Sequence, residues 1–114
     1  MLPYINRLTN KKDFEAVHQY GSFFSFGDIL LKAKKNKSSL SRLGFLVGLN
    51  FSKKATERNR LKRQLRAISG DQLGKIKKGI DIIVMIKKGG KNEIKTDSLE
   101  YNFKKALEKG KLIN

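Results

Sequence analysis

The stretch from residue 80 to residue 86, Ile-Asp-Ile-Ile-Val-Met-Ile, constrains the fold more than any other part of the sequence. All of its residues but one are apolar, so as a β-strand it presents hydrophobic side chains to both faces of a sheet. A strand that is buried on both faces needs a covering layer on each side, as in α/β proteins. The stretch therefore predicts a central strand in a sheet with helices packed on it.

Two helices are predicted near the ends of the sequence. The first is capped by Thr9 or Asn10 and stops at Gly21, a residue that commonly ends helices. The second runs from about Thr96 to Lys109. Apolar residues recur in the second helix at helical spacing and predict its core face: Leu99, Phe103, Ala106 and Leu107.

The middle of the sequence predicts strands followed by a third helix. An aromatic stretch at 20–27 and an apolar stretch at 28–35 suggest two strands or a strand and an irregular edge, and 43–49 predicts another. The third helix begins near Thr56 and is expected to end at Gly70. With 114 residues, the sequence predicts a single domain, 1–114, of the α/β class, in which helices pack on one sheet.

The third helix concentrates the arginines. Four of the six arginines in the sequence fall between residues 58 and 66, although lysine supplies most of the positive charge elsewhere. On a helical projection, one narrow apolar stripe contains Leu61, Leu65 and Ile68. The opposite side carries Asn59, Lys62, Arg63 and Arg66, with Arg58 and Arg60 on its flanks. Because a guanidinium group can bind two phosphate oxygens at once, this face favours RNA over the alternative of a solvated basic face.

The overall charge supports a polyanionic partner. The formal net charge is +16 and the pI is about 10.3, far beyond what solubility requires. There is no cysteine, no apolar run long enough for a membrane span, and no signal-peptide pattern, so we expect a cytoplasmic protein. Insertion at a membrane surface is disfavoured because the arginine helix lacks a bulky apolar face.

Catalytic motifs are missing from the sequence. It contains no phosphate-binding Gly-Lys-Ser/Thr loop, no metal-binding pair of histidines and no nucleophile elbow. Its one histidine, His18, has no second histidine or cysteine to complete a familiar site. If the protein takes part in catalysis, we expect another molecule to hold the reacting groups.

The aromatic segment from Tyr20 to Gly27 allows two interpretations. Exposed rings could stack on nucleobases and form a platform for a single strand. Alternatively, Phe24 and Phe26 could alternate into the core, which is the more common fate of phenylalanine. The sequence alone does not decide whether these rings are exposed or buried.

Residues 55–66, Ala-Thr-Glu-Arg-Asn-Arg-Leu-Lys-Arg-Gln-Leu-Arg, closely resemble the Arg-Asn-Arg signature of the bacterial ribonuclease P protein subunit. That pattern is an alanine, two variable residues, and then R-N-R-x-K-R-x-x-R. The resemblance extends over most of the chain and includes, in order, Arg7-Leu8, Asp13-Phe14, Gly21, Arg42-Leu43-Gly44 and Asp81-Ile82-Ile83-Val84.

The resemblance implies both a fold and a function. The fold is a two-layer α+β sandwich in the order α-β-β-β-α-β-α with a left-handed βαβ crossover, whereas the general rule predicts a right-handed one. The function is that of an accessory subunit: a catalytic RNA with bound Mg²⁺ removes the 5′ leader of precursor tRNA, while the protein binds both RNAs. The resemblance implies no cofactor on the protein, Mg²⁺ held mainly by RNA, no small-molecule substrate and no membrane.

Site residues follow from the resemblance by position. Contacts with the catalytic RNA are expected from Arg58, Asn59, Arg60, Lys62, Arg63 and Arg66, with Lys53 and Lys54 before them. A cleft for the leader is expected to include Phe14, His18 and Lys32, with Phe24 or Phe26. His18 and Lys32 replace aromatic residues of the family pattern. The family pattern also has a pair of lysines after the strand that begins near Gly44, and this chain has Leu49-Asn50 there instead. The alternative function is a ribosomal or general RNA-binding protein without a catalytic complex.

Overall fold

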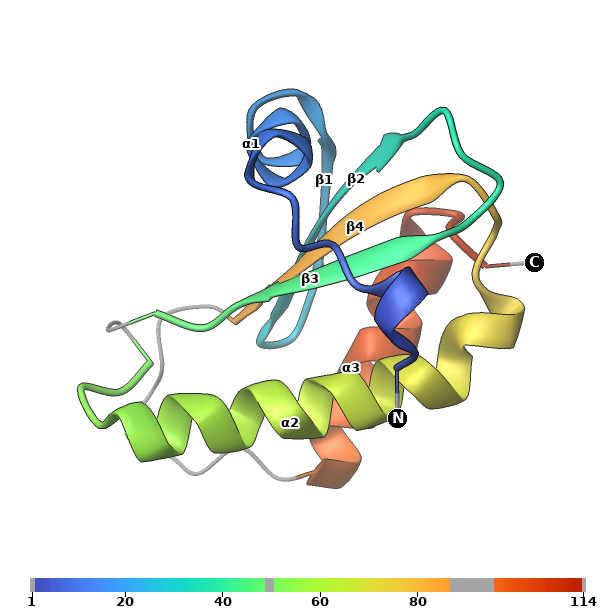
Figure 1. The fold of residues 1–114 in the computed structure, drawn as a ribbon. Helices are drawn as coiled ribbons and strands as arrows, with labels where there is room; N and C mark the ends of the chain where they lie inside the picture. Colours follow the sequence, from blue (N-terminus) through green and yellow to red (C-terminus); the bar gives the residue numbers. More distant parts are fainter. Residues whose placement is uncertain (1, 49–50, 87–95, 114) are drawn as a thin grey trace.

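A computed structural model describes residues 2–48, 51–86 and 96–113 of the chain. Its elements follow the predicted order α-β-β-β-α-β-α (Figure 1). They are α1 (Lys11–Tyr20), β1 (Ser22–Phe26), β2 (Ile29–Lys35), β3 (Arg42–Leu46), α2 (Ala55–Gln72), β4 (Ile80–Ile86) and α3 (Thr96–Lys109). Two short 3-10 turns, η1 (Tyr4–Asn6) and η2 (Leu73–Lys75), precede α1 and follow α2.

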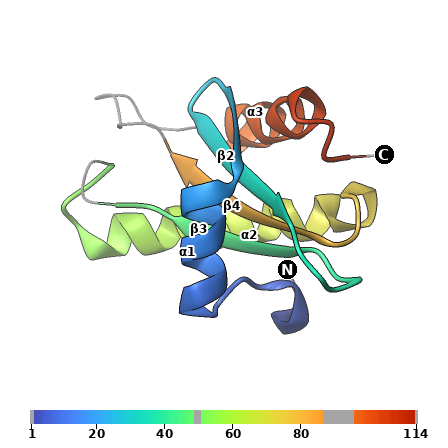
Figure 2. The same cartoon turned by 90° about the horizontal axis from the view of Figure 1, so that it is seen from above.

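The strands form one sheet in the order β1-β2-β4-β3. β2 runs antiparallel to β1 and to β4, while β3 runs parallel to β4. Figures 1 and 2 together show that α2 returns beneath the sheet between these two parallel strands in a left-handed crossover. The family resemblance predicted this handedness correctly, and the general rule for βαβ units did not.

Helices cover both faces of the sheet. α2 and α3 pack on one face, and α1 crosses the other (Figures 1 and 2). The larger core lies between the sheet and α2 with α3, and it includes Leu31, Leu65 and Phe103. A second, smaller core lies under α1 and comprises Leu8, Val17 and Ile83, with Phe14 and Met85 packed against it. β4 is buried on both faces along most of its length, as predicted.

The predicted ends of α1 are confirmed. Asn10 is the N-cap, and its side-chain oxygen accepts hydrogen bonds from the backbone N–H groups of Lys12 and Asp13 at 2.9 and 3.3 Å. Gly21 is the C-cap, and its N–H donates to the carbonyl of Val17. A side chain at residue 21 would meet that carbonyl, since an added Cβ would lie 2.5 Å from the oxygen. The cap residues therefore fix where α1 begins and ends.

Two predicted boundaries are wrong. α2 does not end at Gly70 but continues to Gln72, because the residues around the glycine, Ser69 and Gln72, are buried and tertiary packing outweighs the low helix propensity of glycine. The predicted strand 43–49 pairs with β4 only as far as Leu46. Residue 49 and the predicted basic loop 87–91 lie outside the described residues.

None of the described helices is long and apolar enough to cross a membrane.

Candidate nucleic-acid interface

The basic face of α2 follows from how the helix is anchored. Leu61, Leu65 and Ile68 are buried in the larger core, as their spacing predicted. Because that stripe faces the sheet, the opposite side of the helix meets solvent. Asn59, Arg60 and Arg63 are exposed there, and Lys62 and Arg66 are half-buried. We call the residues Asn59, Lys62, Arg63 and Arg66, with the flanking Arg58 and Arg60, the arginine face.

The two acids of α2 lie near its ends. They are Glu57, which accepts a hydrogen bond from the Ser52 hydroxyl, and Asp71. Asp71 projects at nearly the same angle as Arg60, but at 1.5 Å per residue it lies about 16 Å further along the helix axis. None of Arg60, Lys62, Arg63 and Arg66 forms an ion pair with a described residue. Their donors are therefore available to phosphate groups.

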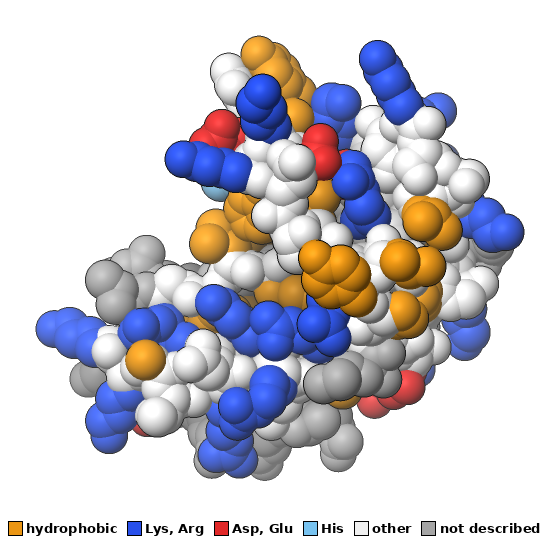
Figure 3. All heavy atoms as spheres, in the orientation of Figure 1, with side chains coloured by type: hydrophobic (Ala, Val, Ile, Leu, Met, Phe, Trp, Pro, Cys, Tyr) orange, Lys and Arg blue, Asp and Glu red, His pale blue; other side chains and the backbone are white. Residues whose placement is uncertain are grey.

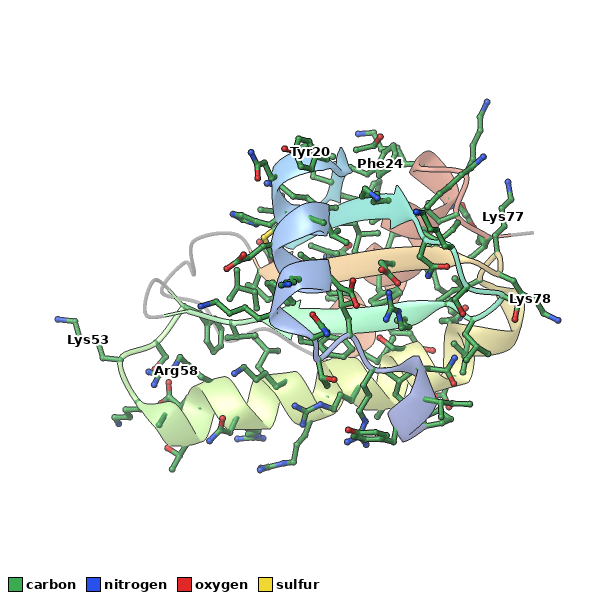
Figure 4. All side chains as sticks on the ribbon, turned by 45° about the horizontal axis from the view of Figure 1, so that its top comes forward. Tyr20, Phe24, Lys53, Arg58, Lys77 and Lys78 are labelled. Carbon is green, nitrogen blue, oxygen red and sulfur yellow. The ribbon has the colours of Figure 1, made fainter. Side chains whose placement is uncertain are left out.

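Arg58 has a second role at the start of α2. Its Nη1 donates to the backbone carbonyl of Ser52 at 2.9 Å, and the Ser52 hydroxyl donates to Glu57 at 2.6 Å. The same hydroxyl oxygen accepts from the backbone N–H of Lys54 at 3.1 Å. Arg58 is half-buried for this reason, so part of its hydrogen-bonding capacity organises the loop before the helix. Lys53 and Lys54 are exposed on that loop, and Figure 4 shows Lys53 pointing away from the body.

A hollow lies between α1 and α2 on the sheet face that α1 only partly covers. Figure 3 shows hydrophobic side chains inside this hollow and basic side chains along its lower rim. Phe14 lies over Gly44, where an added Cβ would be only 2.9 Å from the ring. Met85, which packs against the same smaller core as Phe14, is half-buried, and its register partner Leu46 is 42% exposed. The hollow therefore has an apolar floor. The sequence did not predict it, because Leu46 and Met85 belong to apolar strands whose residues are expected in the core.

His18 and Lys32 meet at the end of α1. The ammonium group of Lys32 donates to the backbone carbonyl of His18 at 2.8 Å. A cation is favoured at this position because the last carbonyls of a helix carry partial negative charge. The His18 side chain is exposed and Lys32 is half-buried, so both are accessible from solvent beside the hollow.

Phe24 and Phe26 are not brought together with Phe14. Their register partners on β2 are Leu31 and Ile29, which face the larger core, so the two rings lie on the opposite side of the sheet. Phe24 packs against Gly110 at the end of α3, and Phe26 makes an edge-on contact with Tyr101 at 5.9 Å between ring centroids. The structure thus places both rings on the face of the sheet opposite to Phe14. Phe24 packs against the larger core, as the second interpretation predicted, whereas Phe26 is 36% exposed.

An ion-pair cluster holds α1 to the sheet. Arg42 donates to both oxygens of Asp81, from Nε at 2.8 Å and from Nη2 at 2.7 Å, and its Nη1 reaches Asp13 on α1 at 3.1 Å. Asn36 also donates to Asp81, at 2.7 Å. The hydrogen bond to Asp81 raises the pKa of Arg42, helped by the charges of both carboxylates, while partial burial opposes the rise.

The sequence did not lead us to predict this cluster, although one residue, Asp81, indicated it. Asp81 is the single polar residue in an otherwise apolar strand, and a buried carboxylate requires a partner. By joining β3, β4 and α1, the cluster fixes the helix that carries Phe14. In the described part of the chain, no group of three His, Cys, Asp or Glu residues could hold a metal ion. The arrangement as a whole can bind phosphates on α2 and bases in the hollow.

Comparison with known proteins identifies similar chains. The model of a family described as Ribonuclease P matches residues 2–111. A ribonuclease P protein component from Synechocystis is 37% identical over 86 residues, which cover 75% of this chain and 69% of that protein. The corresponding component from Thermotoga maritima is 38% identical over 82 residues, covering 72% of this chain and 69% of that protein.

Solved structures show the same fold. The ribonuclease P protein from Thermotoga maritima, in complex with 1-(4-fluorophenyl)-2-thiourea, superposes with a TM-score of 0.80 and 32% identity, covering 89% of this chain and 96% of that one. The protein from Staphylococcus aureus gives a TM-score of 0.84 over 96% of this chain and 98% of that one. Its identity of 24% makes it evidence for the fold alone.

Proposed function

This chain belongs to the ribonuclease P protein family, and from that membership we propose that it is the protein subunit of ribonuclease P, which removes the 5′ leader from precursor tRNA. The chemistry would reside in a catalytic RNA, and the protein would bind that RNA and the leader on two different surfaces. The observation that carries the proposal is the arginine face of α2, a basic surface without an acid among its residues.

The arginine face is suited to the catalytic RNA. A guanidinium group binds two phosphate oxygens in a fixed geometry, so several arginines on one rigid helix recognise how a folded RNA arranges its phosphates. Asn59 adds a donor and an acceptor within the same arc. Arg58, with its loop of Lys53 and Lys54, extends this surface at the start of the helix.

The hollow beside α1 is suited to the leader. A single strand exposes the faces of its bases, and an aromatic ring can stack on one of them with about 1 to 3 kcal/mol. Phe14 offers the ring, Leu46 and Met85 offer an apolar floor, and Lys32 offers a charge for a phosphate. His18 lies at the rim, where the family pattern has a second aromatic residue. We therefore assign the leader to Phe14, His18 and Lys32.

Mg²⁺ would be held mainly by the RNA. Asp13 and Asp81 are two carboxylates that the fold brings together, and both bind the guanidinium group of Arg42. Carboxylate oxygens that already bind a guanidinium group are poor ligands for a hard cation, which needs about six oxygen ligands. What the protein supplies is positive charge and position: it offsets the repulsion between two polyanions and holds the leader in register with the RNA active site. We place this reaction in the cytoplasm.

Cleavage at low Mg²⁺ tests the proposal. Catalytic RNA is incubated with precursor tRNA at a Mg²⁺ concentration at which the RNA alone cleaves slowly, with and without the protein. We expect the protein to increase release of the 5′ leader at the mature end. The variant Arg63→Ala/Arg66→Ala serves as the control. It should reach the same increase in cleavage as the unchanged protein only at higher protein concentration. If cleavage does not increase and the protein instead co-sediments with ribosomal subunits, it is a general RNA-binding protein.

A further inference from the structure

A second basic surface lies at the end of the molecule opposite to the start of α2. Six exposed lysines come from two segments that the sequence separates widely: the end of β2 with the loop after it, and η2 with the segment before β4. We call them the lysine pole: Lys34, Lys35, Lys37, Lys75, Lys77 and Lys78. Figure 4 shows Lys77 and Lys78 pointing away from the body at one end, whereas Lys53 and Arg58 lie at the other. The longest extent of the molecule is 39 Å. Lys77 and Lys78 therefore lie far from the start of α2 and from the loop that carries Lys53, at the end of the molecule where α2 finishes.

The loops that carry the lysine pole are held together by hydrogen bonds. The N–H of Asn36 donates to the carbonyl of Gly79 at 2.8 Å, and the Ser41 hydroxyl donates to the carbonyl of Lys77. The N–H of Lys77 donates to the carbonyl of Leu112 at 2.8 Å. These bonds tie the β2–β3 loop, the segment before β4 and the end of the chain into one frame. The backbone positions that carry the lysines are thus held in place relative to one another.

Side-chain bonds hold the β2–β3 loop itself. The side-chain oxygen of Asn36 accepts from the N–H of Ser38 at 2.8 Å, and its amide group donates to the carbonyl of Leu40 at 3.0 Å. Gly79 faces this loop with a positive φ of 78°, and an added Cβ there would lie 3.0 Å from the Ser38 carbonyl. Close approach of the two backbones therefore requires glycine at residue 79. The lysines on both sides of this contact are kept near one another.

The charge of the pole is not compensated within the described residues. None of the six lysines is ion-paired there, and the loop sequences 34–41 and 73–79 contain no acid. Ammonium groups gathered within about one Debye length of 10 Å repel each other. This repulsion disfavours the folded state, so fold stability does not explain the cluster. Binding of a polyanion would remove the repulsion.

A recess opens beside the pole. It has a volume of about 390 Å³ between α1 and the β2–β3 loop, and Lys34, Lys35 and Lys37 are among the residues that line it. Asp13 and Asp81 also line the recess and share the single positive charge of Arg42. A phosphate group of a nucleic acid backbone is therefore expected on the lysine side of the recess, away from the two carboxylates.

We propose that the lysine pole is a third RNA-binding surface, which contacts the phosphate backbone without reading sequence or local RNA structure. Lysine suits this role because its ammonium group is a compact point charge on a flexible stem, whereas arginine selects a fixed arrangement of phosphate oxygens. The inference rests on the proposed function, since it adds a contact for one of the same two RNAs. The backbone chemistry is shared by the catalytic RNA and the precursor tRNA, and the experiment distinguishes them.

The test compares two triple variants with equal loss of charge. One is Lys75→Gln/Lys77→Gln/Lys78→Gln in the pole, and the other is Lys104→Gln/Lys105→Gln/Lys109→Gln on α3. Affinity for catalytic RNA and for precursor tRNA is measured separately over a range of salt concentrations. In the pole variant, we expect the slope of log K against log salt to become shallower by up to about 0.9 for each lost phosphate contact, with at least one of the RNAs. The α3 variant should change the slope much less.

The identity of the affected RNA shows which backbone the pole contacts. Lys75→Arg/Lys77→Arg/Lys78→Arg keeps the charge and should keep the slope. Equal slopes for the two glutamine variants with both RNAs would overturn the inference, because the effect would then be one of net charge. A separate result would refute the proposed function: no increase in cleavage at low Mg²⁺ with the unchanged protein. If the unchanged protein does stimulate cleavage but the pole variant and the α3 variant have the same salt slopes, only the inference about the lysine pole is refuted.

Discussion

Asp81 shows how a single residue can organise the face that we assign to the leader. It interrupts the apolar run of β4, it is 5% exposed, and it accepts hydrogen bonds from Arg42 and Asn36. A buried carboxylate without partners would cost several kcal/mol, so these contacts are a condition of the fold. Through Arg42 the same cluster reaches Asp13, which connects it to the helix that carries Phe14.

Replacing Arg42 with alanine tests this cluster. The change leaves Asp81 buried without its charge partner, and we expect a loss of about 3 kcal/mol in the free energy of unfolding. Urea denaturation followed by circular dichroism measures it. Asp13→Asn is the control, because it removes only the half-exposed arm of the cluster and should cost less than about 1 kcal/mol. Similar stability of the two variants would show that the Arg42–Asp81 pair does not hold the sheet face together.

Ser69 offers a second test at the residue scale. Its hydroxyl is buried in α2 and has no hydrogen-bond partner among the described residues. Replacing Ser69 with alanine removes the unsatisfied group and improves helix propensity, so we expect the free energy of unfolding to rise by about 1 kcal/mol. Thermal unfolding measures the change. Ala67→Ser, at an exposed position of the same helix, isolates the propensity component. A less stable Ser69→Ala variant would mean that the hydroxyl is satisfied.

At the scale of elements, local patterns predicted more than arrangements in space. The apolar stripe of α2, the caps of α1 and the core face of α3 depend on spacing within one segment, and the structure confirms them. The placement of Phe24 and Phe26 could not be predicted in this way. Alternation along β1 shows that they share a face, but only the tertiary structure decides that α3 lies on that face and α1 on the other. The extension of α2 beyond Gly70 likewise depends on what its last turn packs against.

The arginine face of α2 gives a prediction for one element. Replacing Arg63 and Arg66 with alanine removes two side chains that project away from the core stripe. Binding to catalytic RNA should weaken, and the salt slope should become shallower by up to about one unit for each lost phosphate contact. Filter binding over a range of salt concentrations measures both. Arg63→Lys/Arg66→Lys should keep the slope while losing affinity, because lysine cannot bind two phosphate oxygens at once. An unchanged slope in the alanine variant would show that neither side chain reaches phosphate.

For the whole molecule, the sequence predicted the kind of partner from charge and the fold from resemblance. A net charge of +16 indicates a polyanion but does not show where it binds. The structure distributes this charge over the arginine face and the lysine pole, with the apolar hollow beside α1 between two helical layers. The lysine pole was not predicted, because its loops are far apart in sequence and meet only through the contacts of Asn36, Ser41 and Lys77.

The division of labour between α2 and the hollow is the central claim, and the leader-dependent part of substrate binding tests it most directly. Affinities for precursor and mature tRNA are measured with catalytic RNA saturated by the wild-type protein, by Phe14→Ala or by Arg63→Ala/Arg66→Ala. We predict that the preference for precursor over mature tRNA falls about 5- to 150-fold in Phe14→Ala, as expected for a lost stacking contact of about 1 to 3 kcal/mol. The arginine variant should keep the preference once enough protein is added. A folded Phe14→Ala variant that retains the full preference would contradict the account.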